Sequence, residues 1–363
     1  MTQKKRIAYT LSGEGGGHAS RNLFIIEKLA EQGHTIDIFT YKRSYHEYSK
    51  IFANHPLIHL FKIPGLEFRY SKGKLAKIST AFANTRQILT APLIIGKLAK
   101  LITSNHYDLC IVDTEFFFSR AAKKCKIPTV QINHIPMFPY GKITLPSSLK
   151  MQMACYNIAI KFYMPMSDLI LTNAFYTATN YTRKNIKYIG PVLKKEIFKQ
   201  TPSDDGYILV YLKESIAPFC FPALAENSQQ KFIVFADNPN NYKKYPNITM
   251  KTIGLQSNFV HDLAHCTAVI GVAGIDLPSE AIYLEKPILG IYEEGQFEQR
   301  INGFQIKQCG IGIQIGSRNV TAGTIKQFIK AIPKFHNGIR KYKQTTFKIG
   351  NTEVLNYLEP YLK

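Results

Sequence analysis

The chain has 363 residues, of which 45% are apolar and 20% are charged. That length suits two ordinary domains, and this composition, without any low-complexity tract, excludes long disordered regions. The net charge is +21, and residues 1–200 hold 29 basic and 11 acidic residues, so +18 of the excess lies in the first half. We therefore expect that half to meet an anionic partner, for which nucleic acid, anionic lipid and a phosphorylated acceptor all fit.

The cysteines and the apolar runs restrict where the protein works. Six cysteines are scattered without a CxxC pair or metal-ligand spacing, which predicts no metal and favours a reducing compartment. No apolar run reaches 18 residues, and the short run after Lys4, Lys5 and Arg6 ends in glycines, as in a first strand rather than a signal peptide. We expect a cytoplasmic protein, peripheral on the inner face of the membrane.

Short β-rich runs alternate with helical patterns through the first half, which is typical of a parallel sheet covered by helices. The expected strands are Arg6–Leu11, Thr35–Thr40, Leu109–Val112, Thr129–Asn133 and Leu169–Thr172, with a helix at Leu23–Glu31 and the close of this half near Tyr188–Val192.

The second half repeats the alternation after a polar linker. Its expected strands are Tyr207–Tyr211, Phe232–Phe235, Ala268–Gly271 and Pro287–Ile291. We predict an α/β fold of two doubly wound, Rossmann-like domains that face each other across a cleft, with ligands at the carboxyl ends of the strands. The predicted parts are a first domain at 1–193, a linker at 194–206, a second domain at 207–345, and a C-terminal helix at 346–363 that packs back on the first domain.

The first strand runs into a glycine-rich loop that ends in a histidine. Gly15, Gly16 and Gly17 let the backbone approach a ligand, and the following helix offers free N–H groups. The spacing does not match the dinucleotide pattern GxGxxG. His18 stands at the start of this helix, where a neutral imidazole can act as a general base. The alternative is that His18 only caps the helix.

Two carboxylates follow the strand Leu109–Val112. Asp113 or Glu115 can hold the His18 ring and stabilise the imidazolium as the proton moves. The alternative for both is to cap the next helix, at Phe116–Lys124.

The most specific pattern spans residues 268–302. A strand leads into a glycine turn at Gly274, then Pro278, Ser279 and Glu280 at a helix start. The strand containing Lys-Pro-Ile-Leu follows, and then a polar loop. That loop carries Gln296, Glu298, Gln299 and Asn302.

With this block, the glycine loop with His18, and Val112-Asp113-Thr114-Glu115, the chain resembles GT-B glycosyltransferases of the family-28-like group across both domains. That group includes the peptidoglycan lipid-intermediate N-acetylglucosaminyltransferase. The resemblance implies an inverting, metal-independent transfer from a nucleotide-sugar, UDP-linked, as co-substrate and without a cofactor. It implies a lipid-linked or cell-envelope glycan acceptor, with His18 deprotonating the acceptor hydroxyl.

The resemblance also implies roles in the donor site. Glu280 accepts both ribose hydroxyls, and Glu298 and Gln299 read the sugar hydroxyls, joined by Gln296 and Asn302. Leu277 stands where the family places a hydroxyl for the donor phosphates, beside the acidic Asp276. Backbone N–H groups around Gly274–Ser279 can replace that hydroxyl, and Lys213 can neutralise a phosphate instead. Glycines 15–17 complete the predicted donor-binding set.

Residues 60–104 carry eight Lys or Arg and one acid among large apolar residues. Leu75, Ile78, Phe82 and Leu89 recur at helical spacing, and an apolar face bordered by basic residues is typical of a helix lying on an anionic membrane. The alternative is a core-facing helix with a solvated basic back. The predicted membrane contacts are Lys72, Lys74, Lys77, Phe82, Arg86, Lys97 and Lys100.

Three other functions compete with a transferase. A nucleotide-sugar 2-epimerase shares the fold, but it acts on the donor alone and needs no basic apolar face. A non-catalytic protein that binds an anionic ligand also remains open. Nucleic acid is the partner we expect least, because the sequence has no helix-turn-helix and no aromatic-basic RNA motif.

Overall fold

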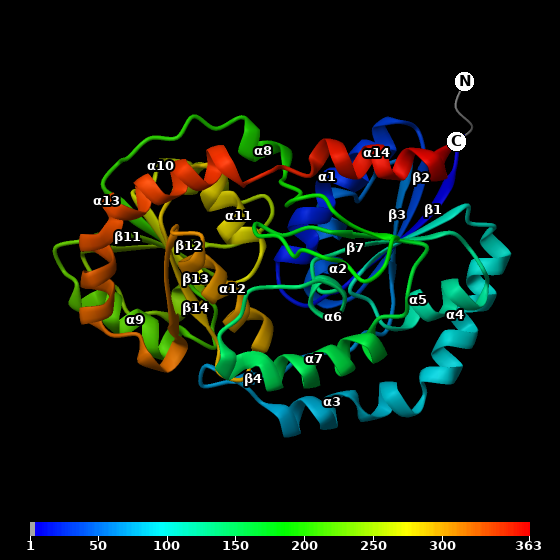
Figure 1. The fold of residues 1–363 in the computed structure, drawn as a ribbon, viewed down its shortest axis with the longest axis horizontal. Coiled ribbons are helices and arrows are strands. Elements are labelled where there is room, and N and C mark those ends of the chain that lie inside the picture. Colours follow the sequence, from blue (N-terminus) through cyan, green and yellow to red (C-terminus); the bar gives the residue numbers. More distant parts are fainter. Residues whose placement is uncertain (1–3) are drawn as a thin grey trace. The chain divides into compact units, whose positions relative to one another are not determined.

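The computed structural model describes residues 4–363 and divides the chain into two compact units (Figure 1). Unit 1 comprises the described residues up to 68, residues 77–193 and residues 349–363, and unit 2 comprises residues 69–76 and 194–348. The chain therefore passes between the units at 68/69, 76/77, 193/194 and 348/349. The sequence prediction had placed 69–76 in the first domain and 194–206 in a linker, whereas the structure assigns both segments to unit 2.

Unit 1 contains a seven-stranded sheet in the order β3-β2-β1-β6-β7-β8-β9, with every neighbouring pair parallel. Its central strands are buried on both faces, which explains their nearly continuous apolar sequences. The strands are β1 (Arg6–Leu11), β2 (Thr35–Thr40), β3 (Ile58–Lys62), β6 (Leu109–Asp113), β7 (Thr129–Ile132), β8 (Leu169–Thr172) and β9 (Ile186–Tyr188).

Helices connect these parallel strands, as crossover connections require. They are α1 (Gly17–Glu31), α2 (Lys42–Ile51), α3 (Lys77–Leu89), α4 (Ala91–Asn105), α5 (Phe117–Lys124), α6 (Met137–Tyr140), the 3-10 turn η1 (Ser147–Leu149) and α7 (Lys150–Tyr163). The last helix, α14 (Asn351–Leu362), also belongs to unit 1, where Asn351 bonds the backbone of Leu193 in both directions at 2.9 and 2.7 Å.

Unit 2 contains a six-stranded parallel sheet in the order β12-β11-β10-β13-β14-β15. The strands are β10 (Tyr207–Tyr211), β11 (Lys231–Ala236), β12 (Ile248–Thr252), β13 (Ala268–Val272), β14 (Ile288–Tyr292) and β15 (Gly312–Gly316). The helices are α8 (Lys195–Phe198), α9 (Ala217–Glu226), α10 (Phe259–His265), α11 (Asp276–Tyr283), α12 (Phe297–Gln308) and α13 (Ala322–Thr345), with 3-10 turns η2 (Pro239–Asn241) and η3 (Ser317–Asn319). A small antiparallel hairpin, β4 (Tyr70–Ser71) and β5 (Lys74–Leu75), completes the unit.

Strand order reverses once in each main sheet, between β1 and β6 in unit 1 and between β10 and β13 in unit 2. In such sheets the loops that diverge at the reversal leave room for a ligand at the carboxyl ends of the strands. In unit 1 the register pairs Leu11 with Asp113, and Ser12 N donates to Asp113 O at 2.9 Å. This pairing brings the glycine-rich loop beside Asp113.

The strands predicted from the sequence are confirmed, most of them to within one residue at either end. The helix predicted at Leu23–Glu31 begins earlier, at Gly17, so its first turn includes the last glycine of the loop and His18. The prediction that a helix includes Leu75 is wrong. Lys74–Leu75 is the second strand of the hairpin, and the helix starts at Lys77.

Candidate active site and donor site

The glycine-rich loop of unit 1 turns the chain from β1 into α1. Gly15 has φ +72°, a backbone conformation that favours glycine, and a Cβ at this position would meet no atom within 4 Å. The loop is therefore open to an approaching ligand. His18 is the second residue of α1, and 18% of its side chain is exposed.

Asp113 lies at the carboxyl end of β6 and holds the His18 ring. His18 Nδ1 lies 3.1 Å from Asp113 Oδ2, and the Asp113 side chain is completely buried. The same carboxylate also accepts hydrogen bonds from Asn22 Nδ2 at 2.5 Å and Thr114 Oγ1 at 2.9 Å. The prediction that one of the two carboxylates contacts the histidine is met by Asp113.

Arg21 completes this cluster, and the sequence prediction did not include it. Its Nε donates to Asp113 Oδ2 at 2.9 Å and its Nη2 to Oδ1 at 2.7 Å, and Nη2 also lies 2.6 Å from His18 Nδ1. Arg21 and Asn22 follow His18 by three and four residues, so they share its face of α1. That spacing is the signal that could have identified them.

The contacts at His18 Nδ1 belong to different tautomers. A protonated Nδ1 donates to Asp113, whereas an unprotonated Nδ1 accepts from Arg21. Only the first tautomer leaves the lone pair on Nε2, the nitrogen that can take a proton from an acceptor. The contact with Asp113 favours the tautomer that a base requires, and the contact with Arg21 favours the other.

The charge of Asp113 is stabilised by its neighbours. Burial disfavours ionisation, but the Arg21 guanidinium and the His18 ring outweigh it and hold the pKa of this carboxyl well below its usual range. With its pKa lowered in this way, Asp113 can stabilise an imidazolium at His18 without taking the proton itself.

Glu115 does not contact His18 and instead caps the start of α5. Its carboxylate accepts from Phe117 N at 2.8 Å and from Phe118 N at 2.5 Å. Burial raises the pKa of Glu115 to about 7, although these amides favour the ionised form. Glu115 therefore acts as a cap of α5, which was one of its two predicted roles. Thr114, with φ +53°, turns the chain between Asp113 and Glu115, so the two carboxylates have different partners.

In unit 2 the buried carboxylate of Glu280 pairs with a buried lysine. Glu280 lies on α11, after the turn at the end of β13, and its Oε1 is 3.4 Å from Lys194 Nζ. Burial raises the pKa of Glu280, while Lys194 acts in the opposite direction. Lys194 was placed in the linker by the sequence prediction, and no local pattern distinguishes it from the other lysines there.

The remaining residues of the β13–α11 turn leave backbone exposed to a ligand. A Cβ on Gly274 would meet no atom within 4 Å. Ser279 is buried and its hydroxyl donates to Ile275 O at 2.6 Å, so that hydroxyl is used inside the helix. Leu277 is also buried, and its Cδ2 occupies the space beside Gly271.

Glu293, at the end of β14, organises the polar loop that follows. It is fully buried, accepts from Lys213 Nζ at 2.6 Å and from the Ser215 hydroxyl, and bonds Gln299 twice. Gln299 Oε1 accepts from Glu293 N at 2.8 Å, and Gln299 Nε2 donates to Glu293 Oε2 at 3.0 Å. Lys213 and Gln299, two of the residues predicted to bind the donor, therefore both bond the carboxylate of Glu293. Glu293 was not predicted from the sequence.

The other predicted residues of this loop lie on the first turns of α12. Asn302 is buried, and its Nδ2 donates to Ala273 O at 3.2 Å, which ties α12 to the turn after β13. Its Nδ2 also lies 3.5 Å from Glu298 Oε1. Gln296, just before the helix, donates to the hydroxyl of Tyr70 at 2.7 Å.

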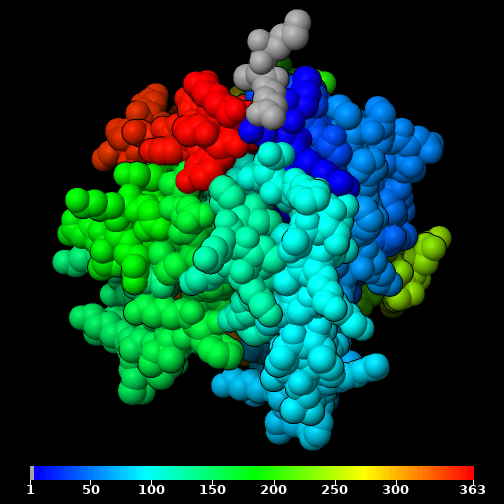
Figure 2. Space-filling model, turned by 90° about the vertical axis from the view of Figure 1, so that its right-hand side faces the viewer, coloured from blue at the N-terminus to red at the C-terminus, as the bar shows by residue number. Residues whose placement is uncertain are grey.

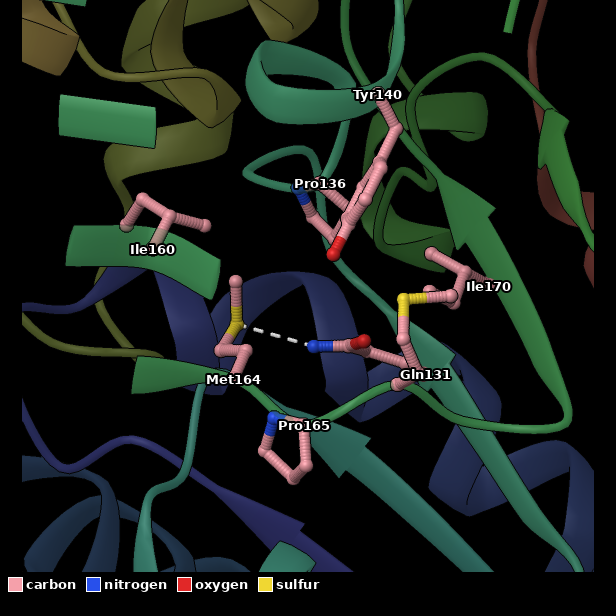
Figure 3. A pocket seen from close by; sticks show the side chains of 8 residues that line it. Gln131, Pro136, Tyr140, Ile160, Met164, Pro165 and Ile170 are labelled. Carbon is pink, nitrogen blue, oxygen red and sulfur yellow. Dashed lines mark hydrogen bonds between the residues drawn. The ribbon is translucent and has the colours of Figure 1, made fainter. Parts of the chain in front are cut away.

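Unit 1 also contains a small cavity that cannot hold a substrate. A space of about 10 Å³ lies between Gln131, Tyr140, Met164 and Ile170 (Figure 3). The Gln131 amide donates to Met164 Sδ at 3.0 Å across it. A volume of this size holds at most about one water molecule, so it is a packing defect.

The basic apolar segment divides between the two units. Lys72 and Lys74 lie on the hairpin of unit 2, whereas Lys77, Phe82 and Arg86 lie on α3 and Lys97 and Lys100 on α4, all of them exposed. Ile78, Phe82 and Leu89 are each more than 70% exposed. The apolar face of α3 is therefore turned to solvent, which contradicts the alternative of a core-facing helix.

Within residues 4–363 no helix is both long and apolar enough to cross a bilayer. The same residues contain no group of three or more His, Cys, Asp or Glu side chains arranged to hold a metal ion.

The family model for glycosyl transferase family 1 matches residues 5–333. The chain belongs to this family. A curated relative described as an uncharacterized glycosyltransferase, from Methanosarcina mazei, is 25% identical over 333 residues, covering 85% of this chain and 84% of its own length.

Solved structures share the fold of this glycosyltransferase. The glycotransferase of kitacinnamycin superimposes with a TM-score of 0.68 at 14% identity, covering 99% of this chain and 100% of its own. LpCGTa, solved in complex with UDP, has a TM-score of 0.66 at 14% identity and covers 99% of both chains. The two Rossmann-like units are those of the GT-B fold, as the sequence predicted.

Proposed function

We propose that this glycosyltransferase moves a sugar from a UDP-sugar to a lipid-linked or cell-envelope glycan acceptor at the cytoplasmic face of the membrane, with inversion and without a metal. Unit 1 activates the acceptor, and unit 2 binds the donor. The observation that carries the proposal is the His18–Asp113 contact, at the carboxyl ends of two adjacent strands.

The chemistry of unit 1 is a single displacement. His18 Nε2 takes the proton of an acceptor hydroxyl while the acceptor oxygen forms a bond to the anomeric carbon of the sugar. The bond between that carbon and the phosphate oxygen breaks, and UDP leaves. Asp113 keeps the proton on Nδ1 and balances the positive charge that develops on the ring.

The donor assignment in unit 2 rests on the turn between β13 and α11. Glu280 offers two carboxylate oxygens for the vicinal hydroxyls of a ribose, and Lys194 keeps that carboxylate oriented. The open backbone around Gly274 precedes the N-terminus of α11, where N–H groups and the helix dipole stabilise a diphosphate. The UDP complex of LpCGTa supports uracil as the base.

The membrane assignment rests on three helices of unit 1. Among the described residues 4–363, eleven large apolar side chains are exposed, and eight of them lie on α3, α4 and α7. These eight are Ile78, Phe82, Ile88, Leu89, Leu93, Met151, Ile158 and Phe162. In Figure 2 the cyan segment, which includes α3 and α4, lies on the surface facing the viewer.

All charged side chains on α3, α4 and α7 are basic. They carry six basic residues, Lys77, Arg86, Lys97, Lys100, Lys150 and Lys161, and no acidic one. An exposed apolar set bordered only by basic groups suits an anionic bilayer surface better than solvent or a neutral protein partner. A nucleotide-sugar 2-epimerase would act on a soluble donor alone, and this surface would serve no purpose in it.

The proposal is tested by donor binding. We expect UDP and UDP-sugars, but not GDP-, ADP- or TDP-sugars, to raise the melting temperature of the protein, because a ligand that binds only the folded state stabilises it. The shift should disappear in Glu280→Ala and persist in Glu226→Ala, a change at the end of α9. A shift that survives Glu280→Ala would contradict the donor site.

A further inference from the structure

The hairpin β4–β5 is joined to the loop after β14 by backbone hydrogen bonds. Glu294 N donates to Gly73 O at 2.7 Å, and Leu75 N donates to Glu294 O at 2.9 Å. The hairpin therefore forms backbone hydrogen bonds with unit 2 like those between two strands. The residues before and after it in the sequence belong to unit 1.

Further contacts fix the turn of the hairpin against η3. The Ser317 hydroxyl donates to Gly73 O at 2.9 Å, and Arg318 Nε and Nη2 both donate to Lys72 O at 3.2 Å. Gly73 has φ +71°, and a Cβ there would lie 2.5 Å from Ser317 Oγ. The position thus requires glycine, and the hairpin is held in one place relative to the sheet of unit 2.

Tyr70 is the side chain that this docking positions. Its hydroxyl accepts a hydrogen bond from Gln296 Nε2 at 2.7 Å, and Lys213 Nζ lies 3.8 Å from the centre of its ring. Gln296 follows β14 and Lys213 follows β10, so Tyr70 links the loops after both strands. A tyrosine hydroxyl is a group that both accepts and donates hydrogen bonds.

A cavity of about 350 Å³ lies beside Tyr70, within the usual range of ligand pockets. It is lined by hairpin residues and by the loops that follow β10 and β11: Tyr70, Ser71, Lys72, Lys213, Glu214, Ser215 and Asp237. Two of these are basic and two acidic, and Lys213 is already paired with Glu293. A balanced, hydroxyl-rich lining beside an aromatic ring suits a neutral polyhydroxylated ring better than a diphosphate.

We propose that this cavity receives the pyranose ring of the donor and that Tyr70 is a specificity-determining residue that contacts it. The inference rests on the proposed function in one respect, the assignment of unit 2 as the donor domain. It adds a part of the sugar site that comes from the first half of the sequence.

The test compares UDP with UDP-hexoses. We would measure by calorimetry the dissociation constants of UDP, UDP-glucose, UDP-galactose and UDP-N-acetylglucosamine for the wild type, Tyr70→Phe and Tyr70→Ala. The preference of the wild type for its best UDP-hexose over UDP should fall about fivefold in Tyr70→Phe, which loses one hydroxyl, and further in Tyr70→Ala. Binding of UDP itself should stay within about twofold.

Two further variants separate a local effect from a general one. Gly73→Ala displaces the hairpin and should reproduce the loss seen with Tyr70→Ala. Tyr207→Phe removes a tyrosine hydroxyl at the amino end of β10, where it donates to Asp262 O at 2.7 Å, and should leave the sugar preference unchanged.

Each adverse outcome has a distinct meaning. If UDP binds the wild type and all Tyr70 variants keep its sugar preference, the inference is wrong while the donor assignment stands. If the variants change only the KM of an acceptor, the cavity binds the acceptor, and the inference is again wrong. If the wild type does not bind UDP or any UDP-hexose, the proposed function itself fails.

Discussion

His18 Nδ1 and Asp113 Oδ2 lie 3.1 Å apart although 95 residues separate them in the sequence. The contact exists because β1 and β6 are neighbours in the sheet, with Leu11 opposite Asp113. The pair therefore depends on the topology of unit 1, and the chemistry of the site can be tested by changing either residue.

Asp113→Asn should lower turnover by about 10²–10⁴-fold, because an amide oxygen no longer balances the imidazolium and Arg21 then competes for Nδ1. The dissociation constant of UDP, whose proposed site lies in unit 2, should change little. Steady-state kinetics and calorimetry on the same preparation check both statements. Unchanged turnover would exclude a role of Asp113 in orienting the base.

Acid should destabilise unit 1 through Asp113. Its pKa in the folded protein lies below the unfolded value, so its contribution to stability is complete above about pH 4 and is lost as the pH falls further. One group contributes at most about 1.4 kcal/mol per pH unit to this slope. Urea unfolding between pH 5 and 3 should give a shallower pH dependence for Asp113→Asn than for the wild type.

The control for this experiment is Asp108→Asn, which removes a partly exposed carboxylate from the same unit. We expect its pH dependence to follow that of the wild type more closely. Equal slopes for the wild type and Asp113→Asn would show that another carboxylate controls acid unfolding.

Lys194→Met should destabilise unit 2 by about 3–5 kcal/mol, because it leaves the buried Glu280 carboxylate without its cation. Lys251→Met is the matched change, since Lys251 pairs with Asp262 at 2.5 Å but is more exposed, and it should cost about 1 kcal/mol or less. Urea unfolding followed by tyrosine fluorescence compares the two. Equal losses would contradict the importance of the Lys194–Glu280 pair.

Replacing Phe82 and Leu89 together by Ser should weaken binding to phosphatidylglycerol-containing vesicles at least about tenfold, because both side chains are more than 70% exposed on α3. Salt should weaken binding of the wild type by screening the basic residues. Vesicle co-sedimentation measures both effects, and Phe198→Ser in unit 2 serves as the control. Binding that survives the double change would place the membrane contact elsewhere.

Local patterns predicted much of the fold. The central strands are buried on both faces, so their sequences are nearly continuous apolar runs. Such runs can be recognised as strands from the sequence alone. The order of the strands is not a local property, so the sequence indicated Asp113 and Glu115 equally. Only the structure separates them, since Asp113 faces His18 while Glu115 bonds the amides of α5.

The hairpin shows a different limit. Leu75, Ile78 and Phe82 fit a helical period, but the turn at Gly73 and the pairing of Leu75 with Glu294 are decided by residues more than 200 positions away. Lys194 and Glu293 were missed for the same reason, because their partners, Glu280 and Gln299, identify them only in three dimensions.

The most direct test of the central claim measures the release of UDP from a UDP-sugar in the presence of a membrane-derived fraction of lipid-linked acceptors. It compares the wild type with His18→Ala. The control is His46→Ala, which changes an exposed histidine on α2. The account predicts acceptor-dependent release by the wild type and by His46→Ala, a loss of about 10²-fold or more in His18→Ala, and unchanged UDP binding in all three. Acceptor-dependent release by His18→Ala at the rate of the wild type would contradict the assignment of His18 as the base.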